Sequence, residues 1–516
     1  MVLGMRTKSQ RRKALATLPA DLYKSFRGII NRIRECPGGT LGMKVLMWVH
    51  FARRPLELAE LQHALAVEEG DTELDLDNIP SEEALLDCCL GLVVVDKETM
   101  TVRFMHYTLA EYFRENINNI ERNILNDFPD GYSCIPETCL TYLNFGRLRQ
   151  HCTSVYSLRD KMKEYIFSKY AALYWGNHVR DNHTNHQPLI KFIQMLVDHE
   201  NECPPFAIQA LFFQIPRKWF SGNRPNVAKK FSGIHVLAYF GLSQNTPLWK
   251  MKQYRDLEDD YKRTPLSWAA EYGHESIVQM LLEWDVDINA KDKDGLTPLI
   301  WAIIEGHVPI ARLLIKRDDL DINTRDQEGQ TPLFSAAKLG QEAVVQLLTE
   351  RGNVNINAKN QDGGTPLYAA AAEGHEASVK LLMEREDIDI NVKSKGGWTP
   401  LSIAVINAHM PVVRLLIGGD KVDVNVKNND GQTPLSLAVE EGQEAIVRIL
   451  IQRDDVDTNA EDKRGRTPLS WAALKGHVEI VRLLIERGDV DMNAGAKRRW
   501  VPLSRVAWKR LEVVVR

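Results

Sequence analysis

The tripeptide Thr-Pro-Leu recurs at a nearly constant interval through the C-terminal half of this 516-residue chain. It begins at Thr264, Thr297, Thr331, Thr365, Thr399, Thr433 and Thr467, and Val501-Pro502-Leu503 continues the series. Successive spacings are 33 residues once and 34 residues six times. A fixed period of this length is typical of a solenoid, in which each unit packs mainly on its two neighbours. We therefore expect a stack of repeats over this half.

Within each unit, the pattern predicts two short antiparallel helices and a loop. Thr is a favourable N-cap, Pro fits the first helical position, and Gly ends the first helix in a left-handed conformation. An Ile-Val-x-Leu-Leu run has the apolar spacing of a second helix, and Asp-x-x-Gly predicts a turn. The unit resembles the ankyrin repeat. We place the array at residues 231–516, with a degenerate first repeat at 231–263 and a truncated last repeat at 501–516.

The N-terminal half has a different pattern of apolar residues. Apolar periodicity predicts helices at residues 41–52, 55–65 and 81–90, strands at 92–95 and 101–104, and a further helix from His106. Three helices followed by a β-hairpin are the plan of a small winged-helix domain, which we place at 41–115. Residues 1–40 then form a residual helical segment with a basic N-terminus, and 116–230 a helical linker domain. The predicted fold class is mainly α.

Several motifs extend this interpretation to a family. These are residues 44–49, 54–56, 61–67, 88–93, 102–113, 138–143 and 174–175. In amino-acid sequence and in order along the chain, they resemble motifs of fungal NACHT–ankyrin proteins, which are signal-transducing NTPases related to NLR immune receptors. The resemblance implies that a NACHT module precedes this region, yet only about one of its helices is expected here, at residues 18–33. No G-x-x-x-x-G-K-[ST] motif occurs in the sequence, so we expect no nucleotide cofactor and no enzymatic activity.

In the family, the histidine of a V-R-x-x-H motif faces the nucleotide phosphate, and His106 matches that position. The resemblance makes His106 a vestigial nucleotide-sensing residue. Without the nucleotide module there is no phosphate for it to contact, so a purely structural role is favoured.

Composition favours a cytoplasmic or nuclear protein. The formal net charge is only −4, no apolar run is long enough to span a membrane, and no signal peptide is evident. Lys8, Arg11, Arg12 and Lys13 form a short basic run that fits a nuclear import signal. A solvated basic helix start explains the same residues and is the more common outcome for such runs.

The sequence disfavours three other kinds of binding. Direct DNA binding is disfavoured because residues 68–87, which include the third helix, contain nine acidic residues and no Lys or Arg. His178, His183 and His186 have no metal-ligand spacing, so a polar loop explains them better. Asp319, Asp321 and Asn323 imitate the start of a calcium loop but lack its glycine and bidentate glutamate. We therefore expect no metal.

Ankyrin arrays generally bind proteins through their hairpin tips and the exposed ends of their first helices. By repeat position, that concave surface carries Tyr272, Leu296, Ile304, Leu339, Trp398, Ile406, Arg464 and Arg466. Exposed aromatic residues are candidate hot spots, and packing on the neighbouring hairpin is an equally favoured alternative for Trp398. Trp268, Trp301 and Trp471 occupy an inward-facing repeat position and are expected in the core.

Taken together, these features predict a non-enzymatic protein-interaction adaptor or regulator, derived from an NLR-like signalling receptor. Two alternatives remain open. The first is a nuclear ankyrin-repeat transcriptional co-regulator that binds a transcription factor. The second is a truncated gene model of a NACHT–ankyrin receptor.

Overall fold

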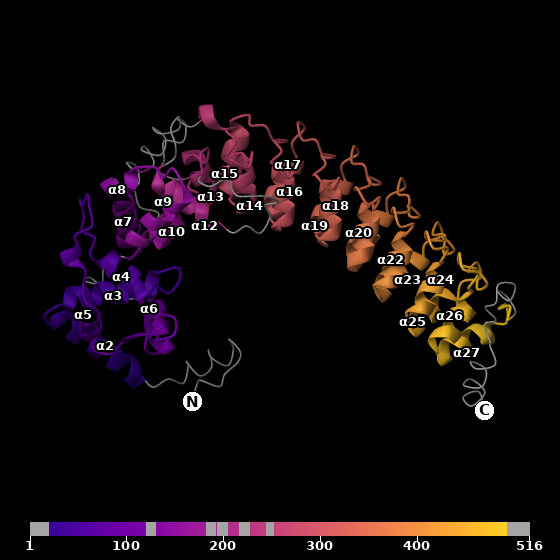
Figure 1. Cartoon of the computed structure of the whole chain (residues 1–516), viewed down its shortest axis with the longest axis horizontal. Helices are drawn as coiled ribbons and strands as arrows, with labels where there is room; N and C mark the ends of the chain where they lie inside the picture. The colour runs from indigo at the N-terminus through magenta and orange to yellow at the C-terminus, as the bar shows by residue number, and fades with distance from the viewer. Residues whose placement is uncertain are drawn as a thin grey trace. The chain divides into compact units, whose positions relative to one another are not determined.

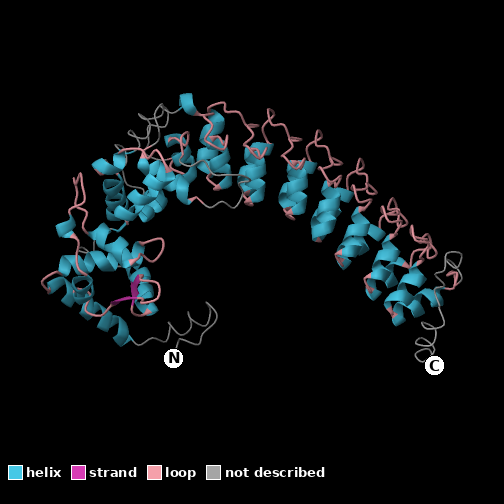
Figure 2. Cartoon of the chain, in the orientation of Figure 1, coloured by secondary structure: helices cyan, strands magenta, loops and turns pink. Residues whose placement is uncertain are grey.

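The computed structural model describes residues 20–119, 131–181, 192, 205–215, 228–243 and 252–492. The chain divides into two compact units, Met1–Pro265 and Leu266–Arg516. Helices dominate both units, and the strands that are described belong to the first (Figures 1 and 2). The predicted mainly α fold is thereby confirmed.

The first unit begins with the winged-helix elements. They are α2 (Ala20–Glu35), α3 (Gly39–Phe51), α4 (Leu58–Leu65), η1 (Leu76–Asn78), α5 (Glu82–Asp87), β1 (Val93–Val95), β2 (Val102–Phe104) and α6 (Tyr107–Asn119). The two strands are antiparallel, with Val93 opposite Phe104 and Val95 opposite Val102. Gly42 lets α3 approach the end of α5, because a Cβ there would lie 2.5 Å from the carbonyl oxygen of Cys88. The predicted three helices, hairpin and following helix are confirmed.

A second group of helices completes the first unit. It comprises α7 (Gly131–Leu143), α8 (Gly146–Arg149), α9 (Val155–Glu164), α10 (Ser168–Asp181), α12 (Phe206–Gln214) and α13 (Gly233–Phe240). Buried aromatic residues join these helices to α3. The Phe167 ring packs edge-on against Trp48 at 5.5 Å and against Tyr142 at 5.2 Å between ring centroids. Such edge-to-face pairs stabilise a core beyond the area that they bury.

Helix α13 is the first helix of the predicted degenerate repeat. It ends at Gly241, which has a left-handed φ of 75°, as the first helix of an ankyrin repeat should. His235 is fully buried and bonds to Ser232 at the start of the helix. Residues 244–251, where a second helix would follow, lie outside the described residues. The predicted truncated repeat at 501–516 also lies outside them.

The second unit is a regular stack of helix pairs (Figure 1). The pairs are α14 (Pro265–Glu271) with α15 (Glu275–Glu283), α16 (Pro298–Ile304) with α17 (Val308–Ile315), α18 (Pro332–Lys338) with α19 (Glu342–Thr349), α20 (Pro366–Glu373) with α21 (Glu376–Met383), α22 (Pro400–Ile406) with α23 (Met410–Ile417), α24 (Pro434–Glu440) with α25 (Glu444–Leu450), and α26 (Pro468–Lys475) with α27 (Val478–Arg487). Thr331 caps α18, its hydroxyl oxygen accepting from the Phe334 amide at 3.2 Å. Other Thr-Pro-Leu threonines repeat this contact.

Side chains at the start of the second helices join each repeat to the one before it. His307 Nε2 lies 2.8 Å from the carbonyl oxygen of Glu271, and His409 Nε2 lies 2.9 Å from that of Ala372. Gln341 takes the place of histidine and donates to the Ile303 carbonyl. These bonds satisfy carbonyls at the ends of the first helices, where no further helical turn is available. The Gly-His element of the repeat is therefore a junction between neighbouring repeats.

Candidate protein-binding surface

The loops between repeats are held in shape by the side chain at the start of each turn. Asp292 Oδ1 accepts from the amides of Asp294 and Leu296, at 2.9 and 2.8 Å. Gly295 has a left-handed φ of 78°, and a Cβ there would lie 3.0 Å from Asp326 Cα. The equivalent residues in later loops make the same pair of contacts, namely Asp326, Asn360, Asn428 and Asp462. The Asp-x-x-Gly pattern is thus a turn, as predicted.

A ladder of asparagines ties consecutive loops together. Asn323 Nδ2 donates to the Asn353 carbonyl at 2.8 Å, and its Oδ1 accepts from the Asn355 amide at 2.7 Å. The same two contacts are made by Asn289, Asn357, Asn391, Asn425 and Asn459. Each asparagine therefore fixes the loop of the next repeat. Because the loops are fixed to one another, the surface they form is organised before any partner binds.

The acids that imitate a calcium loop are accounted for by the same network. Asp321 Oδ1 accepts from the Asn323 amide at 3.1 Å. Asp319 pairs with Arg317 at 2.8 Å, and this hydrogen bond holds the pKa of the Asp319 carboxyl below its usual value. Within the described ranges, no group of three or more His, Cys, Asp or Glu side chains is placed to hold a metal ion.

The predicted partner-binding residues differ in how much they expose. Leu339 is 45% exposed, and Arg464 is also exposed. Four others are half-buried, namely Tyr272, Ile304, Trp398 and Ile406. The prediction for Leu296 is wrong, since only 9% of this residue is exposed. Its amide donates to the Asp292 side chain and its carbonyl accepts from the Asp292 amide, so the closed turn places Leu296 in the core.

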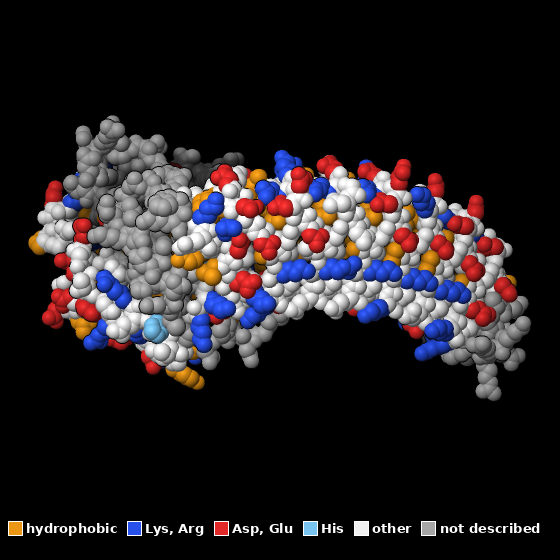
Figure 3. Space-filling view, turned by 90° about the horizontal axis from the view of Figure 1, so that it is seen from above, with side chains coloured by type: hydrophobic (Ala, Val, Ile, Leu, Met, Phe, Trp, Pro, Cys, Tyr) orange, Lys and Arg blue, Asp and Glu red, His pale blue; other side chains and the backbone are white. Residues whose placement is uncertain are grey.

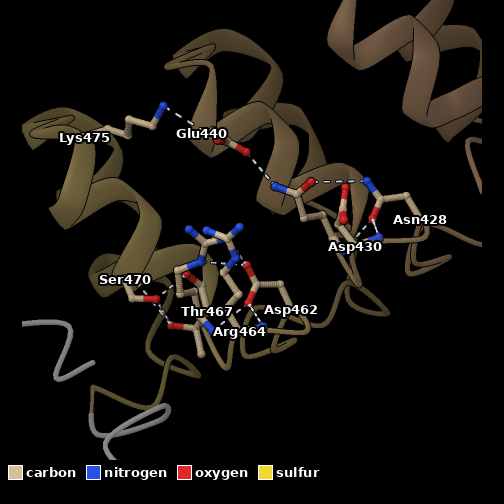
Figure 4. Close-up of polar contacts among 10 residues, drawn as sticks. Asn428, Asp430, Glu440, Asp462, Arg464, Thr467, Ser470 and Lys475 are labelled. Carbon is tan, nitrogen blue, oxygen red and sulfur yellow. Dashed lines mark hydrogen bonds and ion pairs between the residues drawn. The ribbon is translucent and has the colours of Figure 1, made fainter. Parts of the chain in front are cut away.

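Arg466 also departs from the prediction of a free binding residue. Its guanidinium pairs with Asp462 at 2.8 Å, where the two side chains are 14% and 1% exposed. The guanidinium carbon also lies 3.7 Å from the centroid of the Trp471 ring. Figure 4 shows this loop, with Asp462 beside Arg464, and the nearby ion pair of Lys475 with Glu440 at 3.6 Å. The charge of Arg466 is thus compensated inside the array.

The three tryptophans predicted to lie in the core do so. Trp268 and Trp301 are 0% exposed and Trp471 is 5% exposed. The Trp301 indole donates to Asp292 Oδ2 at 2.9 Å, which satisfies its polar group. Trp471 Nε1 is buried with no hydrogen-bond partner among the described residues, because the corresponding oxygen of Asp462 is bound by Arg466.

Trp398 belongs to the loop at residues 393–398, which is closed by a serine. Ser394 Oγ accepts from the Trp398 amide at 3.2 Å, and the Trp398 carbonyl accepts from the Ser394 amide at 2.9 Å. The indole covers Gly396 of the same loop, because a Cβ on Gly396 would lie 2.5 Å from Trp398 Nε1. Tyr368 of α20 lies close enough to Ser394 to interact with its side chain. One half-buried aromatic ring, that of Trp398, therefore belongs to this rigid loop, and a second, that of Tyr368, lies near it.

Sequence reasoning missed a row of cations with the period of the repeat. We call this set the cation row: Lys291, Arg325, Lys359, Lys393 and Lys427. All five are exposed. Figure 3 shows lysine and arginine side chains in a line along the array. The 34-residue spacing was available in the sequence, but a single lysine in a polar loop carries no signal by itself.

The remaining predicted residues lie outside the array. His106 is exposed, and its Nδ1 lies 2.7 Å from Thr108 Oγ1 and accepts from the Thr108 amide at 3.3 Å, at the start of α6. These contacts join His106 to the first turn of α6, and its role stays a prediction. His178 is buried beside Tyr170, 2.8 Å from its hydroxyl, and burial lowers its pKa to about 3. Its predicted neighbours His183 and His186 lie outside the described residues, as do Lys8, Arg11, Arg12 and Lys13.

No helix in the described part of the chain has the length and apolar character needed to cross a membrane. In the winged-helix region, Glu82 and Glu83 lie in the first turn of α5. These two carboxylates lie on the helix that a DNA-binding winged helix would place in the major groove, and they would repel the DNA phosphates.

Comparison with known proteins agrees with both parts of this description. Residues 285–360, 352–428 and 409–496 match three copies of a model of ankyrin repeats, and residues 261–293 match the single ankyrin repeat. Residues 33–125 match the winged helix domain of GPI inositol-deacylase. The azaphilone pigments biosynthesis cluster protein L of Monascus ruber is 24% identical in an alignment of 307 residues that covers 55% of this chain. The match spans 63% of that relative's own length. The chain therefore carries ankyrin repeats together with a winged-helix domain of the GPI inositol-deacylase type.

Proposed function

We propose that this chain is a non-enzymatic adaptor or regulator that binds a partner protein through the loops and first-helix ends of its ankyrin array. The observation that carries the proposal is the loop at residues 393–398. Its backbone is closed by Ser394, it is fixed to neighbouring loops, and it carries the half-buried ring of Trp398. A large aromatic ring on a rigid support is the typical anchor of a protein interface, because little conformational entropy is lost on binding.

Leu339, Ile304 and Ile406 extend the same surface over other first-helix ends. Each is partly exposed although the array has a complete core beneath it. Single exposed apolar residues are common on any protein surface. Ile304 and Ile406 occupy the same repeat position and Leu339 occupies the next one, and this recurrence supports a shared interface here.

The winged-helix match supports our further proposal that the chain derives from an NLR-like signalling receptor, as the sequence motifs imply. In that case the winged-helix and linker helices contact relatives that retain the nucleotide-binding module, and this chain regulates them without binding nucleotide. ATP binding by the purified chain would contradict this part of the proposal.

The test of the main proposal is affinity purification from the source cells with the wild type, Trp398→Ala and a matched control. Ile485→Ala is the control, because Ile485 is 41% exposed but lies on α27, a second helix outside the proposed surface. We expect Trp398→Ala to lose the partner and Ile485→Ala to keep it. If Trp398→Ala retains every partner of the wild type, the proposed surface is wrong.

A further inference from the structure

We infer that the array recognises an acidic segment of its partner in the polyproline II conformation, with a carboxylate at every third residue on the cation row and a proline ring against Trp398. This inference rests on the proposed function and adds the chemical class of the partner. It follows from the hydrogen bonds between members of the row, from the spacing of the row, and from the charges around the loop that carries Trp398.

Hydrogen bonds join neighbouring members of the row at three of its four intervals. Lys291 Nζ donates to the carbonyl of Arg325 at 3.0 Å, and Arg325 donates to the carbonyl of Lys359. Lys393 Nζ donates to the carbonyl of Lys427 at 3.0 Å. A lysine ammonium has three N–H groups, so one such bond leaves the others for a ligand. The bonds place the cations in advance, which reduces the entropy that binding would cost.

The spacing of the row selects a ligand conformation. Stacked helices of neighbouring repeats pack about 8–10 Å apart, so successive cations are separated by about the same distance. A polyproline II helix rises about 3.1 Å per residue with three residues per turn, so every third side chain lies on one face at about 9 Å intervals. In a β-strand, by contrast, side chains three residues apart point to opposite faces. Five cations therefore match a polyproline II segment of about thirteen residues.

The positive charge is confined to the row and is not a property of the whole array. Over residues 266–492, Asp and Glu outnumber Lys and Arg, so the array as a whole does not attract polyanions. The loops that follow Lys291, Arg325, Lys359 and Lys427 each carry an acid three residues after the cation, namely Asp294, Glu328, Asp362 and Asp430. The loop at residues 393–398 carries Lys393 and Lys395 and no acid. It is therefore the most positive point of the row.

That same loop and the helix beside it supply the aromatic surface. Trp398 is half-buried and its amide donates to Ser394, and the half-buried Tyr368 of α20 lies close to the Ser394 side chain. Proline-rich segments in the polyproline II conformation dock against such rings, since their backbone is already extended before binding. The row ends where Glu461 takes the position of the next cation. An acidic, proline-containing segment fits these features better than a nucleic acid, whose closely spaced phosphates would meet the surrounding acids.

The experiment measures binding of labelled peptides to the full chain by fluorescence anisotropy. The probe is a synthetic peptide of five Glu-Pro-Pro units. A peptide of the same composition with its five glutamates contiguous is the comparison, and a single-stranded oligonucleotide is a third ligand. We expect the regular peptide to bind about tenfold more tightly than the clustered one, and to weaken as salt is added.

A matched pair of triple variants tests the row itself. Lys359→Gln/Lys393→Gln/Lys427→Gln removes three members of the row. Lys380→Gln/Arg414→Gln/Arg448→Gln removes three exposed charges from α21, α23 and α25. Only the first triple variant should weaken peptide binding, by about tenfold, with unchanged circular dichroism. Equal weakening by both triples, equal affinity for the two peptides, or tighter binding of the oligonucleotide would each overturn the inference.

Failure of this inference is distinguishable from failure of the proposed function. If the peptides do not bind, but Trp398→Ala still loses the cellular partner while Ile485→Ala keeps it, the surface is correct and its acidic ligand is wrong. If Trp398→Ala retains every partner, the surface itself is wrong.

Discussion

Two loops of the array, residues 393–398 and 461–466, occupy the same position two repeats apart. Both combine basic residues with a tryptophan, since Trp398 ends the first and Trp471 lies beneath the second. Their first turn residues differ. Ser394 is neutral and closes its loop through one hydroxyl oxygen. Asp462 is a nearly fully buried carboxylate that closes its loop and also pairs with Arg466.

The loops also differ at their last residue, Trp398 in the first and Arg466 in the second, and together these differences decide which side chains reach solvent. At the second loop, Arg466 is held between the Asp462 carboxylate and the Trp471 ring, so neither its charge nor the ring is presented to solvent. At the first loop, the side chains of Lys393 and Lys395 are exposed and Trp398 is half-buried. Trp398 thus reaches solvent at the first loop, whereas Arg466 and Trp471 are enclosed at the second.

The largest expected effect separates the two tryptophans. Trp471→Ala should lower the free energy of unfolding of the C-terminal repeats by about 3–5 kcal/mol, because it removes a buried aromatic side chain. Trp398→Ala should cost less than about 1 kcal/mol, since its ring is only half-buried at a loop. Urea unfolding, monitored by hydrogen exchange in individual repeats, measures the free energy of unfolding of both variants. Equal losses for the two variants would show that Trp398 is a core residue.

The sequence predicted the fold far better than this distinction. Thr-Pro-Leu, Gly-His and Asp-x-x-Gly depend on local capping and turn chemistry, so the repeat boundaries followed from the chain alone. Leu296 was misassigned because its burial depends on how the turn closes on Asp292. Arg466 was misassigned because a charge count does not show which carboxylate lies beside which guanidinium.

The winged helix was predicted for a related reason. Its helices and strands are marked by apolar periodicity, which is a local property of the sequence. The cation row depends instead on residues 34 positions apart being brought side by side, and only the stacked structure makes that relation evident.

An intermediate effect is expected from the first turn residues. Asp462→Ala should destabilise the C-terminal repeats by about 3 kcal/mol, because it leaves Arg466 without its buried partner and two amides without an acceptor. Ser394→Ala should cost about 1 kcal/mol, the value of one hydrogen bond to the Trp398 amide.

Asp462→Asn isolates the ion pair from the turn, because Asn360 and Asn428 close equivalent turns. The loss in free energy of unfolding of Asp462→Asn should lie between that of Ser394→Ala and that of Asp462→Ala when all three are compared by urea unfolding. If Asp462→Asn is as stable as the wild type, the pair with Arg466 contributes nothing, and the contrast between the two loops has another cause.

The smallest expected effect comes from Arg466→Gln, which introduces the residue found at this position in two other repeats, Gln330 and Gln432. Removing the guanidinium frees Asp462 Oδ2 to accept from the indole N–H of Trp471, as Asp292 Oδ2 accepts from Trp301 at 2.9 Å. The new hydrogen bond should offset most of the lost ion pair, so the net change stays within about 1 kcal/mol.

The indole proton of Trp471 reports this exchange of partners directly. In Arg466→Gln its hydrogen exchange, followed by NMR, should slow toward that of Trp301, which serves as the internal reference within the same molecule. A loss above about 2 kcal/mol with an unprotected indole proton would show that Asp462 cannot turn to Trp471. In that case the stack of Arg466 on the ring, and not the carboxylate, closes this loop.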